Sequence, residues 1–114
     1  MSITIVLTDD HPLTREGIKG YLLKEPEFEI VGEYADGDSA WAGIQKHKPQ
    51  VALLDIRMPG TDGISLARKI KEAGLRTAAL MLTSYDSNQY VMAALRAGAR
   101  GYVLKTATME TLTR

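Results

Sequence analysis

The feature that most constrains this sequence is a regular alternation of short apolar runs with longer segments of helical periodicity. The apolar runs occupy residues 3–7, 28–34, 51–54, 77–82 and 102–104. Most of them lack a polar/apolar alternation, which is typical of strands that are buried on both faces of a parallel sheet. We therefore predict five strands at these positions.

Four helices are predicted between these strands. The first begins at Pro12, a residue type that is favoured in the first helical turn. The other three are marked by apolar residues at helical spacing, and we expect Gly74 and Gly98 to end the last two of them. A fifth helix is predicted to begin at Thr108 and to be truncated after about two turns, because the sequence stops at Arg114.

This alternation predicts an α/β fold in which an open, five-stranded parallel sheet carries helices on both faces. For five strands, the flavodoxin-like order 2-1-3-4-5 fits best. Ligands of such sheets bind beyond the carboxyl ends of the strands, near the point where the strand order reverses. Functional residues are therefore expected directly after strands 1, 3, 4 and 5.

Composition excludes several classes of protein. A length of 114 residues suits one domain, and the absence of cysteine excludes a disulfide scaffold, a cysteine-type zinc finger and a thiol enzyme. Because 14 Lys+Arg balance 14 Asp+Glu, bulk electrostatic binding of DNA is not expected. No apolar run approaches the roughly 18 residues of a membrane span, and no signal peptide is recognisable. We expect a cytoplasmic domain without membrane contact.

Polar side chains stand at four of the predicted strand ends. Asp9 and Asp10 follow the first strand, Asp55 the third, Thr83 the fourth and Lys105 the fifth. Two carboxylates at 4 Å repel each other by about 4 kcal/mol at an effective dielectric constant of ~20, so three of them should raise their own pKa values or recruit a cation. Oxygen ligands favour Mg²⁺, and an aspartate can carry a phosphoryl group covalently. The residues predict a Mg²⁺-dependent phospho-aspartate site.

Simpler explanations exist for each of these residues taken singly. An Asp after a strand commonly forms a turn or caps a helix, and a single Lys is commonly solvated. Among other functions, binding of FMN is disfavoured because the acidic loop after the first strand would repel the phosphate of the cofactor. An aspartate-nucleophile phosphohydrolase would need a cap, for which 114 residues leave no room. A phosphorylation-independent interaction module stays open.

Three segments, residues 9–17, 54–63 and 93–102, resemble the response-regulator receiver domains of the NarL/FixJ-type subgroup. The resemblance covers essentially the whole chain and implies that residues 1–114 form one phospho-acceptor domain. Such a domain is a switch, not an enzyme, with at most self-phosphorylation and self-dephosphorylation activity.

The resemblance also implies a metal site. Asp55 would accept the phosphoryl group, Asp10 would bind Mg²⁺ directly and Asp9 would do so through water. The backbone carbonyl of Arg57 would be a further ligand. His11 is expected to be a helix-start residue beside this site and not a metal ligand.

For the switch, the resemblance implies that Thr83 and Lys105 hold the phosphoryl group, while Tyr102 turns inward when Thr83 moves. Most receiver domains have Pro after this Lys, whereas this chain has Thr106, as the subgroup commonly does. A cis peptide bond is therefore not expected there, because it costs about 3 kcal/mol or more without proline.

The partners implied by the resemblance are a sensor histidine kinase and, through a C-terminal helix-turn-helix domain that these residues do not include, DNA. The function implied is therefore control of transcription by a two-component phosphorelay. Homodimer formation is left open, and the short fifth helix predicts exposed apolar surface beside the first helix.

Overall fold

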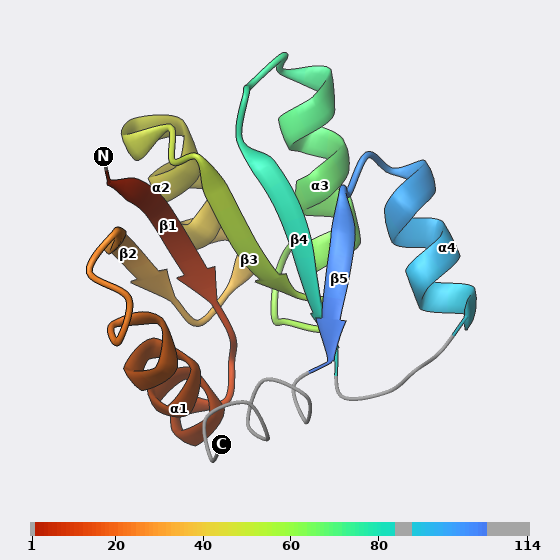
Figure 1. Ribbon diagram of the computed structural model, residues 1–114. Helices are drawn as coiled ribbons and strands as arrows, with labels where there is room; N and C mark the ends of the chain where they lie inside the picture. Colours follow the sequence, from red (N-terminus) through yellow and green to blue (C-terminus); the bar gives the residue numbers. More distant parts are fainter. Residues whose placement is uncertain (1, 84–87, 105–114) are drawn as a thin grey trace.

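The computed structural model describes residues 2–83 and 88–104, which form five strands and four helices (Figure 1). The strands are β1 (Ile3–Thr8), β2 (Phe28–Tyr34), β3 (Val51–Asp55), β4 (Ala78–Thr83) and β5 (Gly101–Leu104). The helices are α1 (Pro12–Leu22), α2 (Gly37–His47), α3 (Gly63–Glu72) and α4 (Asn88–Arg96). Every predicted strand is confirmed to within one residue at each end. The fifth helix predicted from Thr108 lies outside the described residues.

The strands form one parallel sheet in the order β2-β1-β3-β4-β5, which confirms the predicted topology. The register pairs Ile5 of β1 with Val51 of β3, and Leu54 of β3 with Met81 of β4. All strands run the same way, so their carboxyl ends meet at the lower edge of the sheet in Figure 1. Residues that directly follow β1 and β3 are therefore brought side by side.

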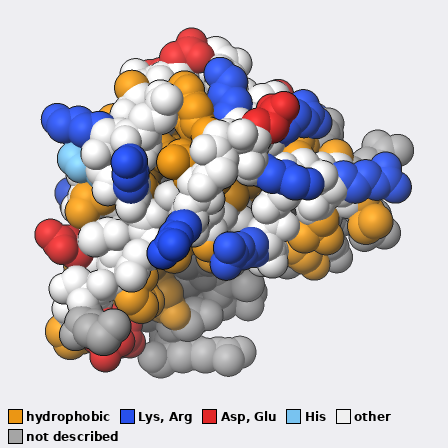
Figure 2. Space-filling view, turned by 90° about the horizontal axis from the view of Figure 1, so that it is seen from above, with side chains coloured by type: hydrophobic (Ala, Val, Ile, Leu, Met, Phe, Trp, Pro, Cys, Tyr) orange, Lys and Arg blue, Asp and Glu red, His pale blue; other side chains and the backbone are white. Residues whose placement is uncertain are grey.

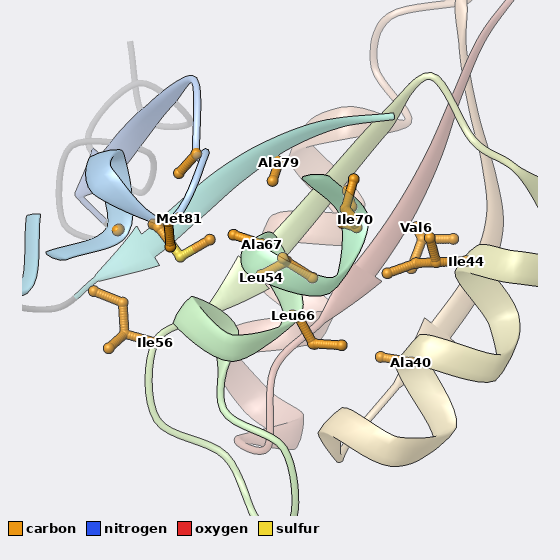
Figure 3. Close-up of a cluster of buried hydrophobic side chains, with 14 residues drawn as sticks. Val6, Ala40, Ile44, Leu54, Ile56, Leu66, Ala67, Ile70, Ala79 and Met81 are labelled. Carbon is orange, nitrogen blue, oxygen red and sulfur yellow. The ribbon is translucent and has the colours of Figure 1, made fainter. Parts of the chain in front are cut away.

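The larger part of the core lies between the sheet and helices α2, α3 and α4. Leu54 and Met81 from the central strands are fully buried there and pack with Leu66 of α3 (Figure 3). At the β1 end of the same cluster, Val6 lies against Ile44 of α2. The alternation of side chains along each strand directs every second residue to this face.

The other face of the sheet carries α1. Ile18 and Leu22 of this helix pack with Leu7 and Leu53, the strand residues that alternate with those of the first cluster. An apolar hollow of about 350 Å³ lies beside α1 on this face, with Phe28 in its lining. None of the helices in the described part of the chain is both long and apolar enough to cross a membrane.

Side-chain caps explain where two helices begin. Asp36 accepts a hydrogen bond from the backbone N–H of Ser39 at 2.8 Å at the start of α2, and Asp62 accepts one from Ser65 at 2.7 Å at the start of α3. At the other end of α3, Gly74 has a φ of 69°, as expected for a glycine that ends a helix. The carboxylates of Asp36 and Asp62, which lie close to the carboxyl ends of the strands, are therefore engaged in helix capping.

The cap at Asp36 predicts a pH-dependent stability. Hydrogen bonds from the backbone N–H and the hydroxyl of Ser39 hold the pKa of Asp36 below its ordinary value. A carboxyl whose pKa is lowered by folding stabilises the fold above its unfolded pKa of about 4, and this contribution is lost as the pH falls through the folded pKa. Asp36→Asn keeps a capping oxygen but does not titrate. We expect it to melt below the wild type at pH 7, with a difference that shrinks as the pH falls below the unfolded pKa of about 4. A difference that stays constant with pH in thermal melts would contradict the assignment.

Candidate functional site

The acidic residues predicted at the strand ends lie together. Asp9 and Asp10 directly follow β1, and Asp55 is the last residue of the neighbouring strand β3. One ligand atom each from these three residues and from His11 lie within 4.8 Å of one another. Two segments that are 45 residues apart in the sequence thus form one cluster because β1 and β3 pair in parallel.

The cluster is largely withdrawn from solvent. Asp9 is completely buried, Asp55 is 6% exposed, and the side chain of Asp10 is 29% exposed. Among the described residues, the hydroxyl of Thr8 is buried and forms no hydrogen bond, and Oδ1 of Asp10 is buried with Nδ1 of His11 3.0 Å away. Burying carboxylates at such separations is costly unless a positive charge compensates them. Three carboxylates in this arrangement fit a hard divalent cation such as Mg²⁺.

Several groups hold Asp9 in place. Its Oδ1 accepts a hydrogen bond from the backbone N–H of His11 at 2.9 Å, and its own N–H donates to the carbonyl of Tyr34 at 3.1 Å. Nη1 of Arg15 donates to the carbonyl of Asp9 at 2.6 Å. The sequence predicts no role for Arg15. The position of Arg15 in the first turns of α1, just after the acid pair, could have indicated such a role.

His11 lies closer to the carboxylates than the sequence suggests. It is the residue before α1 and has extended backbone angles, so its prediction as a helix-start residue is confirmed. Its Nδ1 is also 3.4 Å from Oδ1 of Asp9 and 3.0 Å from Oδ1 of Asp10, while its side chain is 69% exposed. His11 therefore borders the acidic cluster on its solvent side.

The loop after β3 folds back tightly onto Asp55. The N–H of Gly63 donates to the carbonyl of Ile56 at 3.1 Å, and a β-carbon at Gly63 would clash with the carbonyl oxygen of Asp55. Gly60 has a φ of 74°, in the region that favours glycine. Arg57 lies in this loop with an exposed side chain. The role of its carbonyl as a metal ligand stays a prediction.

The structure describes the other predicted site residues to different extents. Thr83 ends β4, one residue beyond Leu82, the residue that pairs with Asp55, so its backbone lies at the same edge of the sheet. Tyr102 pairs with Met81 in β5 and is 42% exposed, and its role as the aromatic switch stays a prediction. Lys105 lies outside the described residues.

Basic side chains are frequent at the amino edge of the sheet, although the net charge of the chain is zero. Figure 2 shows the molecule from the side of the amino ends of the strands, where most of the charged side chains are Lys or Arg. Lys48, Arg76 and Arg100, for example, are exposed in the segments that lead into β3, β4 and β5. The acidic cluster lies at the opposite edge of the sheet.

Comparison with known proteins agrees with this arrangement. Residues 5–114 match the sequence profile of the response regulator receiver domain. The chain is 40% identical over 110 residues to the transcriptional regulatory protein DegU of Brevibacillus brevis, a match that covers 96% of this chain and 47% of DegU. It is 42% identical over 106 residues to the probable transcriptional regulatory protein NarL of Mycobacterium tuberculosis, covering 93% of this chain and 49% of that protein.

Solved structures show the same relationship. The signal receiver domain of the putative response regulator NarL from Mycobacterium tuberculosis superposes with a TM-score of 0.89 at 38% identity, over 98% of this chain and 94% of that domain. A LuxR-family response regulator from Aurantimonas sp. SI85-9A1 gives a TM-score of 0.89 at 30% identity, over 99% of this chain and 81% of that one. The chain spans about half the length of the regulators DegU and NarL. The chain therefore belongs to the response regulator receiver domains and is of the NarL type.

Proposed function

We propose that this domain accepts a phosphoryl group on Asp55 in a Mg²⁺-dependent reaction and thereby switches between two conformations. The observation that carries the proposal is the convergence of Asp9, Asp10 and Asp55 at the carboxyl edge of the sheet. Receiver domains of response regulators are signalling switches and bind Mg²⁺ at an acidic pocket. The proposal assigns this chain at most self-phosphorylation and self-dephosphorylation activity.

In the proposed reaction, a carboxylate oxygen of Asp55 attacks the phosphorus of a phosphohistidine in line with the bond to nitrogen. The new P–O bond forms as the P–N bond breaks, and the imidazole leaves with the bonding electron pair and takes up a proton. Asp10 directly, Asp9 through water and the carbonyl of Arg57 would hold Mg²⁺. When bound, Mg²⁺ neutralises charge on the carboxylates and on the transferred group.

The switch would follow from contacts that exist only after phosphorylation. The phosphoryl oxygens are strong acceptors, and we assign the hydroxyl of Thr83 and the ammonium group of Lys105 as their donors. Such contacts shift an equilibrium between two existing conformations. Tyr102, half-exposed on β5, would report the change at the surface formed by α4 and β5.

Response regulators of this type are phosphorylated by sensor histidine kinases and bind DNA through a C-terminal domain. We propose a sensor histidine kinase as the donor for Asp55 and residues 1–114 as the receiver part of a regulator of transcription. Contact with DNA would then belong to a domain outside these 114 residues. The proposed location is the cytoplasm, with no membrane partner, and phosphorylation-linked dimerisation is an outcome to be measured.

Beryllofluoride, which mimics a phosphoryl group on a carboxylate, tests the proposal by NMR. With Mg²⁺ present, we expect it to shift the backbone amides of Asp55, Thr83 and Tyr102, because the phosphoryl contacts and the aromatic switch respond together. Removal of Mg²⁺ with EDTA should reverse the shifts. Absence of beryllofluoride binding would instead identify a phosphorylation-independent interaction module, and shifts that persist without Mg²⁺ would contradict the metal site.

A further inference from the structure

The tip of the loop between β3 and α3 is bound to the start of α2. Oγ1 of Thr61 donates a hydrogen bond to Oδ1 of Asp38 at 2.7 Å, and the backbone N–H of Gly37 donates to the carbonyl of Pro59 at 3.1 Å. The backbones approach closely here, since a β-carbon at Gly37 would clash with the carbonyl of Thr61. Two elements far apart in the sequence are thus linked beside the acidic cluster.

Helix capping does not account for the contact between Asp38 and Thr61. Asp36 already caps α2, and Asp62 caps α3. Asp38 lies in the first turn of α2, and its carboxylate accepts a hydrogen bond from the loop. The turn at Gly60 brings the chain against the same carboxylate, because a β-carbon at Gly60 would lie 2.8 Å from Oδ2 of Asp38.

The β3–α3 loop is therefore held at two points, its base and its tip. At its base, Gly63 packs against the carbonyl of Asp55 and hydrogen-bonds to Ile56. At its tip, Asp38 holds Thr61. Arg57 lies between the two anchors in the sequence, two residues after Asp55.

We propose that Asp38 and Thr61 are positioning residues that form a loop latch, which holds the β3–α3 loop so that the carbonyl of Arg57 faces the Mg²⁺ site. The latch rests on the proposed function of that site and sets its affinity for Mg²⁺. Asp38 acts through Thr61, because it is not among the residues whose ligand atoms gather within 4.8 Å. Preorganised ligands bind a cation more tightly because less ordering is required on binding.

Asp38→Ala and Thr61→Val remove the acceptor and the donor of the latch, respectively. Each is expected to weaken Mg²⁺ binding about three- to tenfold, the range that corresponds to one lost hydrogen bond. The double variant should lose no more affinity than either single variant, because both break the same bond. Asp38→Asn and Thr61→Ser retain an acceptor and a donor, respectively, and should bind Mg²⁺ within about twofold of the wild type.

The test is calorimetric titration of each variant with Mg²⁺ at a temperature where circular dichroism shows all of them folded. Ser39→Ala is the matched control, because the hydroxyl of Ser39 also donates to a carboxylate at the start of α2, but to that of the N-cap residue Asp36. It should leave Mg²⁺ affinity unchanged. In Thr61→Val, faster amide hydrogen exchange confined to residues 57–61 would support the conclusion that the Asp38–Thr61 contact holds the β3–α3 loop.

The outcomes separate the latch from the function on which it rests. A wild type that does not bind Mg²⁺ would overturn the proposed function. A wild type that binds Mg²⁺, together with Asp38→Ala and Thr61→Val variants of equal affinity, would overturn the latch alone. If Asp38→Asn lost as much affinity as Asp38→Ala while Thr61→Val lost none, the charge of Asp38 and not its hydrogen bond would be responsible, which also overturns the latch.

Discussion

Asp55→Asn is expected to abolish phosphoryl transfer to this domain while leaving it folded. The amide has nearly the same shape as the carboxylate but is neutral and far less nucleophilic, so no acyl phosphate forms. Asp55 is 6% exposed and lies in a cluster of like charges, so removal of one charge should leave stability equal or greater. The measurement is intact-protein mass after incubation with a small-molecule phosphodonor and Mg²⁺, in which only the wild type gains one phosphoryl group.

The control for this experiment is Asp62→Asn. Asp62 lies on the same loop, but its carboxylate caps α3, a role that asparagine also fills. The variant should be labelled at the wild-type rate. Undiminished labelling of Asp55→Asn would show that another residue is the acceptor and would remove the basis for the assigned site.

Leu54→Ala is expected to cost about 2–5 kcal/mol of unfolding free energy. Leu54 is fully buried in β3 and packs in the larger core cluster, directly before the proposed phospho-acceptor (Figure 3). Since a domain of this size has a total stability of about 5–15 kcal/mol, the melting temperature should fall by about 10 °C or more.

Urea denaturation measures this loss, and Leu13→Ala provides the matched leucine control. Leu13 is 87% exposed on α1, so its truncation should change the unfolding free energy by less than about 0.5 kcal/mol. Equal losses for the two variants would contradict the description of the core.

The order of strands and helices was predictable because it depends on local patterns. Unbroken apolar runs such as 51–54 predict buried parallel strands, and Pro12 and Gly74 mark helix ends through their backbone preferences alone. Parallel strands joined by right-handed helical connections allow few topologies, so the sheet order followed as well. The meeting of Asp9, Asp10 and Asp55 is a consequence of that order.

Contacts within the site were less predictable, because they depend on side-chain direction and on loop paths. No periodicity indicates that Arg15 reaches the carbonyl of Asp9 or that His11 approaches the acid pair. Their roles depend on the angle at which α1 leaves β1, which packing on the sheet determines.

The sequence by itself determined the fold, the family and which acidic residues share one edge of the sheet. Only the tertiary structure decided how the loop after Asp55 is held, through Gly63 at its base and the Asp38–Thr61 contact at its tip. The physical reason is how far apart in the sequence the interacting residues lie. Strand and helix patterns are repeated along the chain and can be read locally, whereas a single hydrogen bond between residues 38 and 61 forms only because α2 and α3 pack side by side on one face of the sheet (Figure 1).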